Sequence, residues 1–430
     1  MIRAIASLVV ALTLAGAANG QEVVDVAPAE TTIGTSAVED VAAPLPPSRQ
    51  RPAENTDEGG LWGVSDRAEQ QARLSGQLET DQALNAYVRG VACRVAGDFC
   101  GDIRLYLMNR PFFNAQMAPN GYMEAWSGLM LRVEDEAQLA FVLGHEIGHF
   151  GERHSLEALR ATRARATGAL VASVVIAAAG TAAAVNSPNS AGSISDVTRI
   201  AVDAVYLGTL ASLFGFSREN ERAADMIGFD HAVAAGYDAN AGKTLWTNLI
   251  GEMRASDNPD VRRREARGSI FNTHPLSSDR VEALTERAAA HAGGGETHRA
   301  RYRAAIRPFI DSWLRAELRR RDFGQTSFVL DRLATHGEDL GVIEFYRGEM
   351  NRLRRGEGDR DRARTHYANA IGYPDAPAAA WRELGDFAAR DGNAAQAVQH
   401  LRIYLERAPN AEDRALVEAR ISQLDQGGAQ

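Results

Sequence analysis

The first ordered part of the chain shows three short patterns of hydrophobic and polar positions. Apolar residues recur at helical spacing through residues 84–95, which predicts an amphipathic helix. The segment 103–107 reads Ile-Arg-Leu-Tyr-Leu and alternates as a half-buried strand does. An Asn-Gly turn at 120–121 precedes a second expected strand at 122–126. Together these patterns predict a small sheet packed with helices.

A longer helix is predicted from about Glu134. Asp135 and Glu136 are expected in its first turn, where acidic side chains interact favourably with the helix dipole. Four apolar residues at helical spacing are expected to point into a core: Leu139, Val142, Leu143 and Ile147.

Two alanine-rich apolar runs follow, at residues 168–185 and 205–216. The first is barely long enough to cross a bilayer, and alanine contributes little free energy to membrane insertion. Buried or paired helices are therefore the favoured interpretation. The alternatives are a hairpin that gives residues 168–216 a peripheral membrane contact and, least favoured, a true membrane span. Pro, Gly and Ser between the runs predict a mobile loop at 186–195.

The last third of the chain repeats with a period of 34 residues. Glycine recurs at this spacing, at Gly324, Gly358 and Gly392. Two further series keep the same period, namely Val329, Ala363 and Ala397, and then Leu333, Tyr367 and Leu401. Such a period, with small residues where helices meet, resembles tetratricopeptide repeats (TPRs), which present a concave surface to peptides or partner proteins. The alternative is a plain helical bundle whose spacing matches by accident.

Composition narrows the class of protein. Hydrophobic residues make up 45% of the 430 residues and charged residues 24%, which suits two or three domains with real cores. Aromatic residues at 7% and a mean hydropathy of −0.27 exclude a polytopic membrane protein and a mostly disordered chain. The formal net charge of −9 argues against nucleic acid as the main partner.

The N-terminus indicates export. Arg3 precedes a short apolar stretch and then small residues, which is the pattern of a cleaved signal peptide over residues 1–20. Residues 21–60 are rich in Pro, Ala, Thr and acidic residues and predict a flexible linker. In an exported chain Cys93 and Cys100 are expected to form a small-loop disulfide, and the alternative is two buried thiols. A bacterial periplasm fits all of these features.

Candidate chemistry lies in the segment 145–149, which reads His-Glu-Ile-Gly-His. On a helix, His145 and His149 lie on one face about one turn apart, so both imidazoles can bind a single cation. Zinc suits this arrangement because it accepts imidazole nitrogen and tolerates three protein ligands plus water. Glu146 is rotated about 100° from His145, so we expect it to act on the water as a general base. The alternative is a helix with two surface histidines.

A third ligand is expected from residues 217–225, Ser-Arg-Glu-Asn-Glu-Arg-Ala-Ala-Asp. This segment carries two carboxylates at helical spacing, Glu221 and Asp225. Glu221 could complete the coordination of the metal, and Asp225 could accept the free N–H of a ligating histidine and orient its ring. The alternative is a solvated acidic helix face.

The histidine motif and the downstream Glu221-x-x-x-Asp225 resemble the zinc metallopeptidase family that includes the CAAX prenyl proteases and the heat-shock protease HtpX. Two other segments match that family, namely Asn114-Ala-Gln-Met-Ala-Pro119-Asn-Gly121 and Thr273-His274-Pro275 with Arg280. The resemblance covers about residues 65–290.

The resemblance implies a mainly α chain. An α+β zincin-type metallopeptidase domain with a small sheet would span residues 61–295, and a TPR-like helical array would span 296–425. It also implies one Zn²⁺ ion per chain. The implied ligands are His145, His149 and Glu221, with Glu146 as the general base and Asp225 orienting a ligand.

Two further histidines need separate interpretations. By the same resemblance, His274 occupies a loop position where a histidine can act as a reversible fourth zinc ligand that keeps the enzyme latent. The alternatives are a structural His-Pro turn and hydrogen bonding to the transition state. His154 follows His149 by five residues, falls off the ligand face of an extended helix, and is expected at the surface or in a salt bridge.

The expected substrate is an extended polypeptide. The segment 121–127 is expected at the edge of the small sheet, where a peptide could add as a further strand with little sequence preference. This favours a periplasmic zinc endopeptidase that cleaves unfolded or misassembled envelope proteins, with the repeats docking substrates or the outer-membrane assembly machinery. The alternative is a chaperone or assembly scaffold for outer-membrane proteins with a largely latent zinc site.

Overall fold

The computed structural model describes residues 51–165, 216–266, 277–291 and 294–427. Several predictions fall outside these ranges and are not tested. They concern the signal peptide, most of the linker, the apolar runs up to residue 215, and His274. Within the described residues, none of the helices combines the length and the hydropathy needed to cross a membrane.

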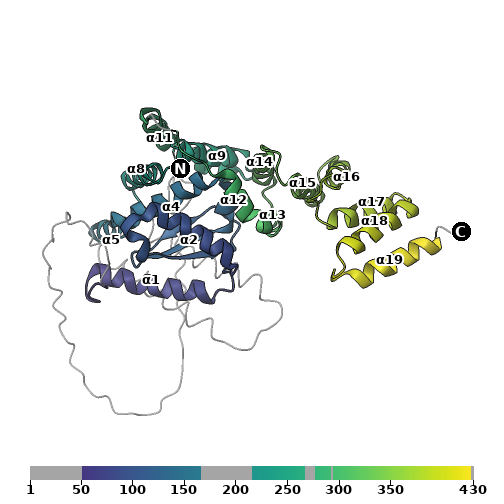
Figure 1. Ribbon diagram of the computed structural model, residues 1–430, viewed down its shortest axis with the longest axis horizontal. Helices are drawn as coiled ribbons and strands as arrows, with labels where there is room; N and C mark the ends of the chain where they lie inside the picture. The colour runs from purple at the N-terminus through teal and green to yellow at the C-terminus, as the bar shows by residue number, and fades with distance from the viewer. Residues whose placement is uncertain (1–50, 166–215, 267–276, 292–293, 428–430) are drawn as a thin grey trace, which may run out of the picture. The chain divides into compact units, whose positions relative to one another are not determined.

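The part of the chain with the histidine motif combines helices with one small sheet (Figure 1). Its elements are α1 (Asp57–Leu74), α2 (Gln82–Ala96), η1 (Gly97–Gly101), β1 (Arg104–Met108), β2 (Ala115–Met117), β3 (Tyr122–Trp126), α3 (Ser127–Arg132), α4 (Glu136–Gly151), α5 (His154–Arg165), α8 (Arg218–Ala234), α9 (Ala241–Ala255), α10 (Pro259–Ala266) and α11 (Ser278–Ala290). The predicted helices and strands at 84–95, 103–107, 122–126 and from about 134 are therefore confirmed.

The sheet has the strand order β1-β3-β2. β3 pairs in parallel with β1 and antiparallel with β2, so it is the central strand. The expectation that residues 121–127 form an edge is therefore wrong, because β2 occupies the side that was expected to be open. Alternate residues of β3 face two apolar clusters. Met123 and Ala125 join the main core with α4, and Tyr122 and Trp126 pack near α1 on the opposite face (Figure 1).

Helix α4 is buried along nearly its whole length. Asp135 caps its N-terminus by accepting a hydrogen bond from the backbone N–H of Gln138 at 2.9 Å. Asp135 thus lies just before the first turn in which it was expected. α4 packs closely across α8 because glycines meet there, and a Cβ atom on Gly228 would lie 2.8 Å from the backbone nitrogen of His145. This close approach brings the side chains of α8 to the histidine motif.

The N-terminal boundary and the cysteines give one correction and one confirmation. Helix α1 begins at Asp57, inside the segment 21–60 that was expected to be a linker. Thr56 caps the N-terminus of the helix by accepting a hydrogen bond from the N–H of Gly59, a start signal that composition alone does not reveal. Cys93 and Cys100 form a disulfide, as predicted.

The remainder of the described chain is helical. It comprises α12 (Arg299–Ile306), η2 (Arg307–Phe309), α13 (Ile310–Arg319), α14 (Phe323–Ala334), α15 (Leu340–Arg354), α16 (Asp359–Ala370), α17 (Ala379–Arg390), α18 (Ala394–Arg407) and α19 (Arg414–Gly427). The recurring positions Val329, Ala363 and Ala397 lie in alternate helices, and all three are buried. A helical array is therefore confirmed, and its assignment to the TPR class stays a prediction.

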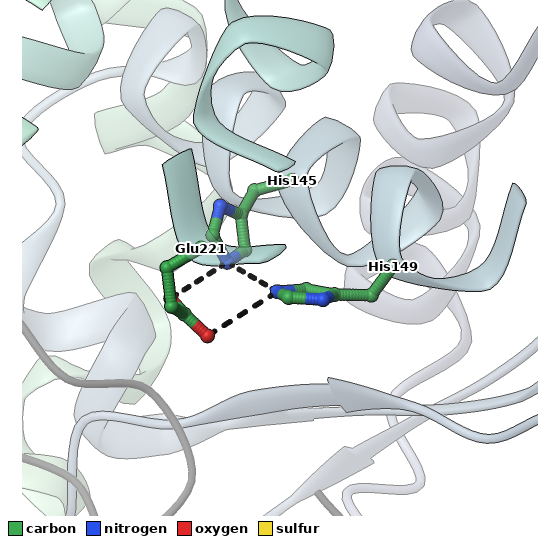
Figure 2. A group of neighbouring side chains, drawn as sticks. All are labelled: His145, His149 and Glu221. Carbon is green, nitrogen blue, oxygen red and sulfur yellow. Dashed lines mark hydrogen bonds and ion pairs between the residues drawn. The ribbon is translucent and has the colours of Figure 1, made fainter. Parts of the chain in front are cut away.

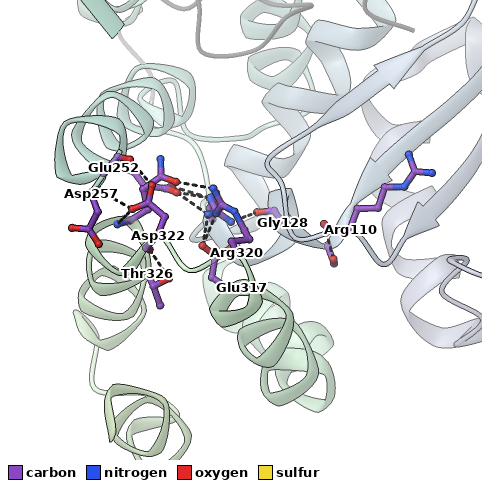
Figure 3. Close-up of polar contacts among 12 residues, drawn as sticks. Arg110, Gly128, Glu252, Asp257, Glu317, Arg320, Asp322 and Thr326 are labelled. Atoms are coloured by element: carbon purple, nitrogen blue, oxygen red, sulfur yellow. Dashed lines mark hydrogen bonds and ion pairs between the residues drawn. The ribbon is translucent and has the colours of Figure 1, made fainter. Parts of the chain in front are cut away.

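A buried ionic cluster joins this array to the sheet-containing part (Figure 3). Arg132 ends α3, and its Nη2 lies 2.7 Å from Glu252 on α9 and 3.0 Å from Glu317 on α13. Arg320 lies 2.5 Å from the same Glu317 carboxylate. We call Arg132, Glu252, Glu317 and Arg320 the junction cluster. Since Arg132 lies between β3 and α4, the array is tied to the segment that leads into the histidine motif.

Candidate metal centre

Two imidazoles from α4 face each other. The Nε2 atoms of His145 and His149 lie 3.0 Å apart, and both rings are buried. The helix produces this arrangement because residues at i and i+4 project from one face. The alternative of two surface histidines is therefore wrong.

Glu221 on α8 points toward the same two nitrogens (Figure 2). Its carboxylate oxygens lie 3.5 Å from Nε2 of His149 and 3.6 Å from Nε2 of His145. Ser217 begins α8 with a capping box, accepting a hydrogen bond from the backbone N–H of Asn220. The cap fixes the first turn of the helix, and Glu221 follows directly with no measurable exposure.

The spacing of these three groups fits a zinc ion. In a regular tetrahedron with metal–ligand bonds of about 2.0–2.1 Å, neighbouring ligand atoms lie about 3.3–3.4 Å apart. The two nitrogens lie 3.0 Å apart, and each lies 3.5 or 3.6 Å from a different oxygen of Glu221, so the three groups are spaced close to that value. Two imidazole nitrogens and one carboxylate oxygen are also a donor set that zinc accepts. The site therefore has the chemistry and the dimensions of a zinc centre.

Asp225 lies one turn after Glu221 and contacts the far side of His145. Its Oδ1 is 3.0 Å from Nδ1 of His145, and Nε1 of Trp246 donates to the same oxygen at 3.2 Å. Burial alone would raise the pKa of Asp225, but the charge and hydrogen bonds of Arg280 lower it to about 2. An ionised Asp225 accepts a hydrogen bond from Nδ1–H of His145. The proton of the neutral ring is then on Nδ1, and the lone pair of Nε2 is directed at the donor set.

Arg280 is a member of the site that the sequence marked only as part of a family match. Its guanidinium donates to both oxygens of Asp225, at 2.6 and 2.7 Å, and Nη1 lies 2.7 Å from Glu221. It also lies over the ring of Trp246, 5.0 Å from the centroid. Arg280 thus connects the two carboxylates of α8 and fixes their orientation. Nothing local in the sequence indicates this role, because α11 is remote from α8 along the chain.

His154 is buried, so the prediction of a surface histidine is wrong. Its Nδ1 lies 2.9 Å from Nδ1 of His149, and burial lowers its pKa. The helical spacing does not extend to His154, because α4 ends at Gly151 and the chain turns at Arg153. Gly151 is a helix-stop signal that could have revealed this change of direction. Phe216 stacks on the ring of His149, with centroids 3.9 Å apart.

Glu146 is also buried, between the two histidines along α4. Burial disfavours the charge of Arg280, whereas the carboxylates of Asp225, Glu221 and Glu146 together hold its pKa above the ordinary value. Glu146 therefore lies within electrostatic reach of the donor set. His274 lies outside the described residues.

Comparison with known proteins places this geometry in a family. Residues 78–288 match the model of peptidase family M48. The beta-barrel assembly-enhancing protease of Escherichia coli K12 is 27% identical over 265 residues, which cover 60% of this chain and 50% of the relative. The metalloprotease YcaL of the same organism is 28% identical over 177 residues, covering 41% of this chain and 59% of the relative.

A eukaryotic relative matches the same region. The mitochondrial metalloendopeptidase OMA1 of Schizosaccharomyces pombe is 30% identical over 182 residues, covering 42% of this chain and 45% of the relative. The chain spans about half the length of the curated relatives it matches. The family match contains the two histidines, Glu221, Asp225 and Arg280. Residues 78–288 of this chain are therefore a peptidase family M48 domain.

Proposed function

We propose that the chain is a zinc endopeptidase. His145, His149 and Glu221 hold the ion, and Asp225 orients His145. A zinc ion held there supplies Lewis acidity, which polarises a peptide carbonyl and makes water more acidic. A carboxylate oxygen of Glu146 takes the proton of the attacking water and delivers it to the nitrogen of the leaving amine. The observation that carries this proposal is the convergence of two Nε2 atoms and one carboxylate within 3.6 Å of one another.

The substrate proposed for this site is an extended, unfolded polypeptide. The central strand β3 has partners on both sides, so the added strand would pair with β2. The backbone of β2 is bonded to β3 through alternate residues, as when Ala118 donates to Tyr122 at 2.7 Å and Trp126 donates to Asn114 at 3.0 Å. The N–H and C=O groups of Ala115 and Met117 therefore point away from β3. A strand bonded to them would be recognised mainly through its backbone.

The proposed setting is the bacterial periplasm. Residues 1–20 would be a cleaved signal peptide, and a linker would lead to a metallopeptidase domain that begins with α1 at Asp57 and ends at about 295, followed by a helical array at about 296–425. One relative is named for enhancing β-barrel assembly. By analogy, the substrates would be unfolded or misassembled envelope proteins, and the array would dock these substrates or the outer-membrane assembly machinery. Residues 168–216 would supply any peripheral membrane contact.

His274 is proposed as a reversible fourth ligand of the same ion. Its removal should then raise the basal rate of peptide cleavage, because a latent fraction of the enzyme is released. An equal basal rate in His274→Ala contradicts latency and favours the structural turn, and a lower rate contradicts latency and favours hydrogen bonding to the transition state.

The proposal is tested by Glu146→Gln. This variant keeps the shape of the side chain and removes its basicity, so zinc content should be unchanged while cleavage of unfolded casein falls by at least about 10²-fold. Glu286→Gln, at an exposed position of α11, is a matched control that should cleave at the wild-type rate. Retained cleavage in Glu146→Gln would contradict the assigned role of this carboxylate.

The alternative function is a chaperone or assembly scaffold in which the zinc site is largely latent. The helical array favours this alternative, because such arrays bind partner proteins and do not themselves catalyse a reaction. Glu146→Gln separates the two functions in cells that lack the wild-type chain. Proteolysis predicts that envelope quality control is lost, whereas scaffolding predicts that it is retained.

A further inference from the structure

The second imidazole of the metal centre, that of His149, faces another histidine on the side away from the donor set. Nδ1 of His149 lies 2.9 Å from Nδ1 of His154, whereas the corresponding nitrogen of His145 faces a carboxylate. His149 and His154 are 2% and 6% exposed. The two rings are nearly perpendicular, with an interplanar angle of 72°, so the contact is made through the nitrogens and not by stacking.

A contact between two imidazole nitrogens requires one donor and one acceptor. If His154 donated its proton, Nδ1 of His149 would be bare, and a neutral His149 would carry its proton on Nε2. That nitrogen is the one that faces His145 and Glu221, 3.0 and 3.5 Å away. A protonated Nε2 cannot bind a cation. Metal binding therefore requires His149 to donate from Nδ1 and His154 to accept.

The backbone is arranged to make this contact. Helix α4 ends at Gly151, and Arg153 adopts the left-handed region with φ of 57°. A residue other than glycine rarely adopts this conformation without a structural reason. The turn starts α5 at His154 and directs its side chain back toward His149. Phe216 covers the face of the His149 ring, with an interplanar angle of 16°, and limits its rotation.

We propose that His154 is a positioning residue of the metal centre. It accepts a hydrogen bond from Nδ1–H of His149 and thereby keeps the lone pair of Nε2 available to bind zinc. The proposal rests on the proposed zinc site, and it assigns to His154 the function that Asp225 has toward His145. The two ligands are thus oriented by different chemistry, one by an ionised carboxylate and the other by a neutral ring.

Two variants of nearly equal shape separate positioning from packing. Asn can place its amide oxygen near the position of the His Nδ1 atom and can accept a hydrogen bond, whereas the isosteric Leu cannot. We expect zinc affinity, measured by chelator competition on the full chain, to fall about 10–100-fold in His154→Leu. His154→Asn should recover most of that loss. His400→Leu, which removes a half-buried histidine of α18, is the control and should bind zinc as the wild type does.

A second measurement reports on the proton itself. In ¹⁵N spectra of the metal-free chain with labelled histidine, the wild type should show His149 with its proton on Nδ1. His154→Leu should show a mixture of the two tautomers, and His154→Asn should resemble the wild type. Co²⁺ replacing zinc should give an altered visible spectrum in the Leu variant only.

Three results would overturn the proposal. These are equal zinc affinity in the Leu and Asn variants, a Leu variant that binds zinc as the wild type does, or an unchanged tautomer in the Leu variant. If His154→Leu does not fold, the comparison of His154→Asn with the wild type still decides: nearly wild-type zinc affinity is expected, and a loss as large as that predicted for the Leu variant would overturn the proposal. Failure of the zinc site itself would appear differently, since the wild-type chain would then bind no zinc in the same assay.

Discussion

Two buried clusters of charged residues in this protein contain similar groups but differ in charge balance and in function. The junction cluster opposes Arg132 and Arg320 to Glu252 and Glu317, so its formal charges cancel. Among the described residues of the metal centre, Glu146, Glu221 and Asp225 lie near Arg280, and these four side chains carry a formal charge of minus two. We call these four residues with His145 and His149 the site cluster. A buried net charge is costly unless it is compensated. A divalent cation would compensate the charge of the site cluster, whereas the junction cluster has no net charge to compensate.

The two clusters also differ in the geometry of their polar contacts. In the junction cluster each carboxylate is directed at a guanidinium, at distances of 2.5–3.0 Å. In the site cluster, two ring nitrogens and one carboxylate are directed at a common point, at separations of 3.0–3.6 Å. Direct pairing stabilises a fold, whereas convergent acceptors create a binding site. The two clusters should therefore respond differently to the same kind of change.

The largest effect is expected from Glu221→Gln. Replacing an anionic ligand with a neutral one should reduce zinc affinity strongly and lower casein cleavage by at least about 10³-fold. In the metal-free chain the same change should alter the free energy of unfolding by less than about 1 kcal/mol, because the weakened pair with Arg280 is offset by relief of repulsion among the carboxylates. Chelator competition and urea denaturation in EDTA measure the two quantities.

The matched change in the junction cluster is Glu317→Gln. It should leave zinc affinity as in the wild type and destabilise the chain, because Arg132 and Arg320 would lose the charge of the carboxylate that they share. The contrast between the clusters fails if Glu317→Gln weakens zinc binding as much as Glu221→Gln does.

The next effect in size is expected from Arg132→Met. This change leaves Glu252 and Glu317 buried without their common partner, which should destabilise the chain by about 3–5 kcal/mol. Urea denaturation in EDTA measures it, and zinc affinity of the folded protein should not change. Arg402→Met removes an exposed ion pair with Asp425 and should cost less than about 1 kcal/mol. Similar costs for the two variants would show that the junction cluster is no stronger than a surface pair.

Local sequence patterns predicted the parts of this structure that depend on neighbouring residues. Helical spacing located α2 and the position of His145 relative to His149, alternation located β1, and the Asn-Gly turn located the start of β3. These elements follow from periods of 3.6 and 2 residues, which a sequence displays directly. The pairing of Cys93 with Cys100 followed from their closeness and the expected compartment.

The features that were missed depend on distant parts of the chain. Strand β2 has three residues, too few for alternation to be recognised, and its position made β3 central instead of an edge. His154 was misplaced because the helical pattern was continued beyond Gly151, where the chain turns. The contact of Arg280 with both carboxylates of α8 arises only from tertiary packing.

The smallest effect concerns a third buried carboxylate, Glu136 in the first turn of α4. Burial alone would raise its pKa, but hydrogen bonds from Arg301, Tyr237 and Tyr87 and the charge of Arg94 lower it to about 2. Its ordinary value is 4.5, so its contribution to stability is fully present above that pH and is lost as pH falls toward 2. Glu136 is thus a directly paired group, like those of the junction cluster.

The change that tests this is Glu136→Gln. The variant should be less stable than the wild type by about 1–3 kcal/mol at pH 7, and the difference should shrink at pH 3. Urea denaturation at both pH values measures it. Asp230→Asn, which alters an exposed ion pair with Arg287, should show little difference at either pH. If the difference in free energy of unfolding between Glu136→Gln and the wild type were the same at both pH values, the assigned pairing would be contradicted.

The central claim is that two histidines of α4 and Glu221 of α8 bind one zinc ion, and zinc X-ray absorption on the purified chain tests it most directly. The account predicts one zinc per chain with two imidazole ligands and oxygen ligands at about 2.0–2.1 Å. His149→Ala should lose the ion or show a single imidazole. Zinc bound with the same stoichiometry and the same spectrum in the wild type and in His149→Ala would contradict the account.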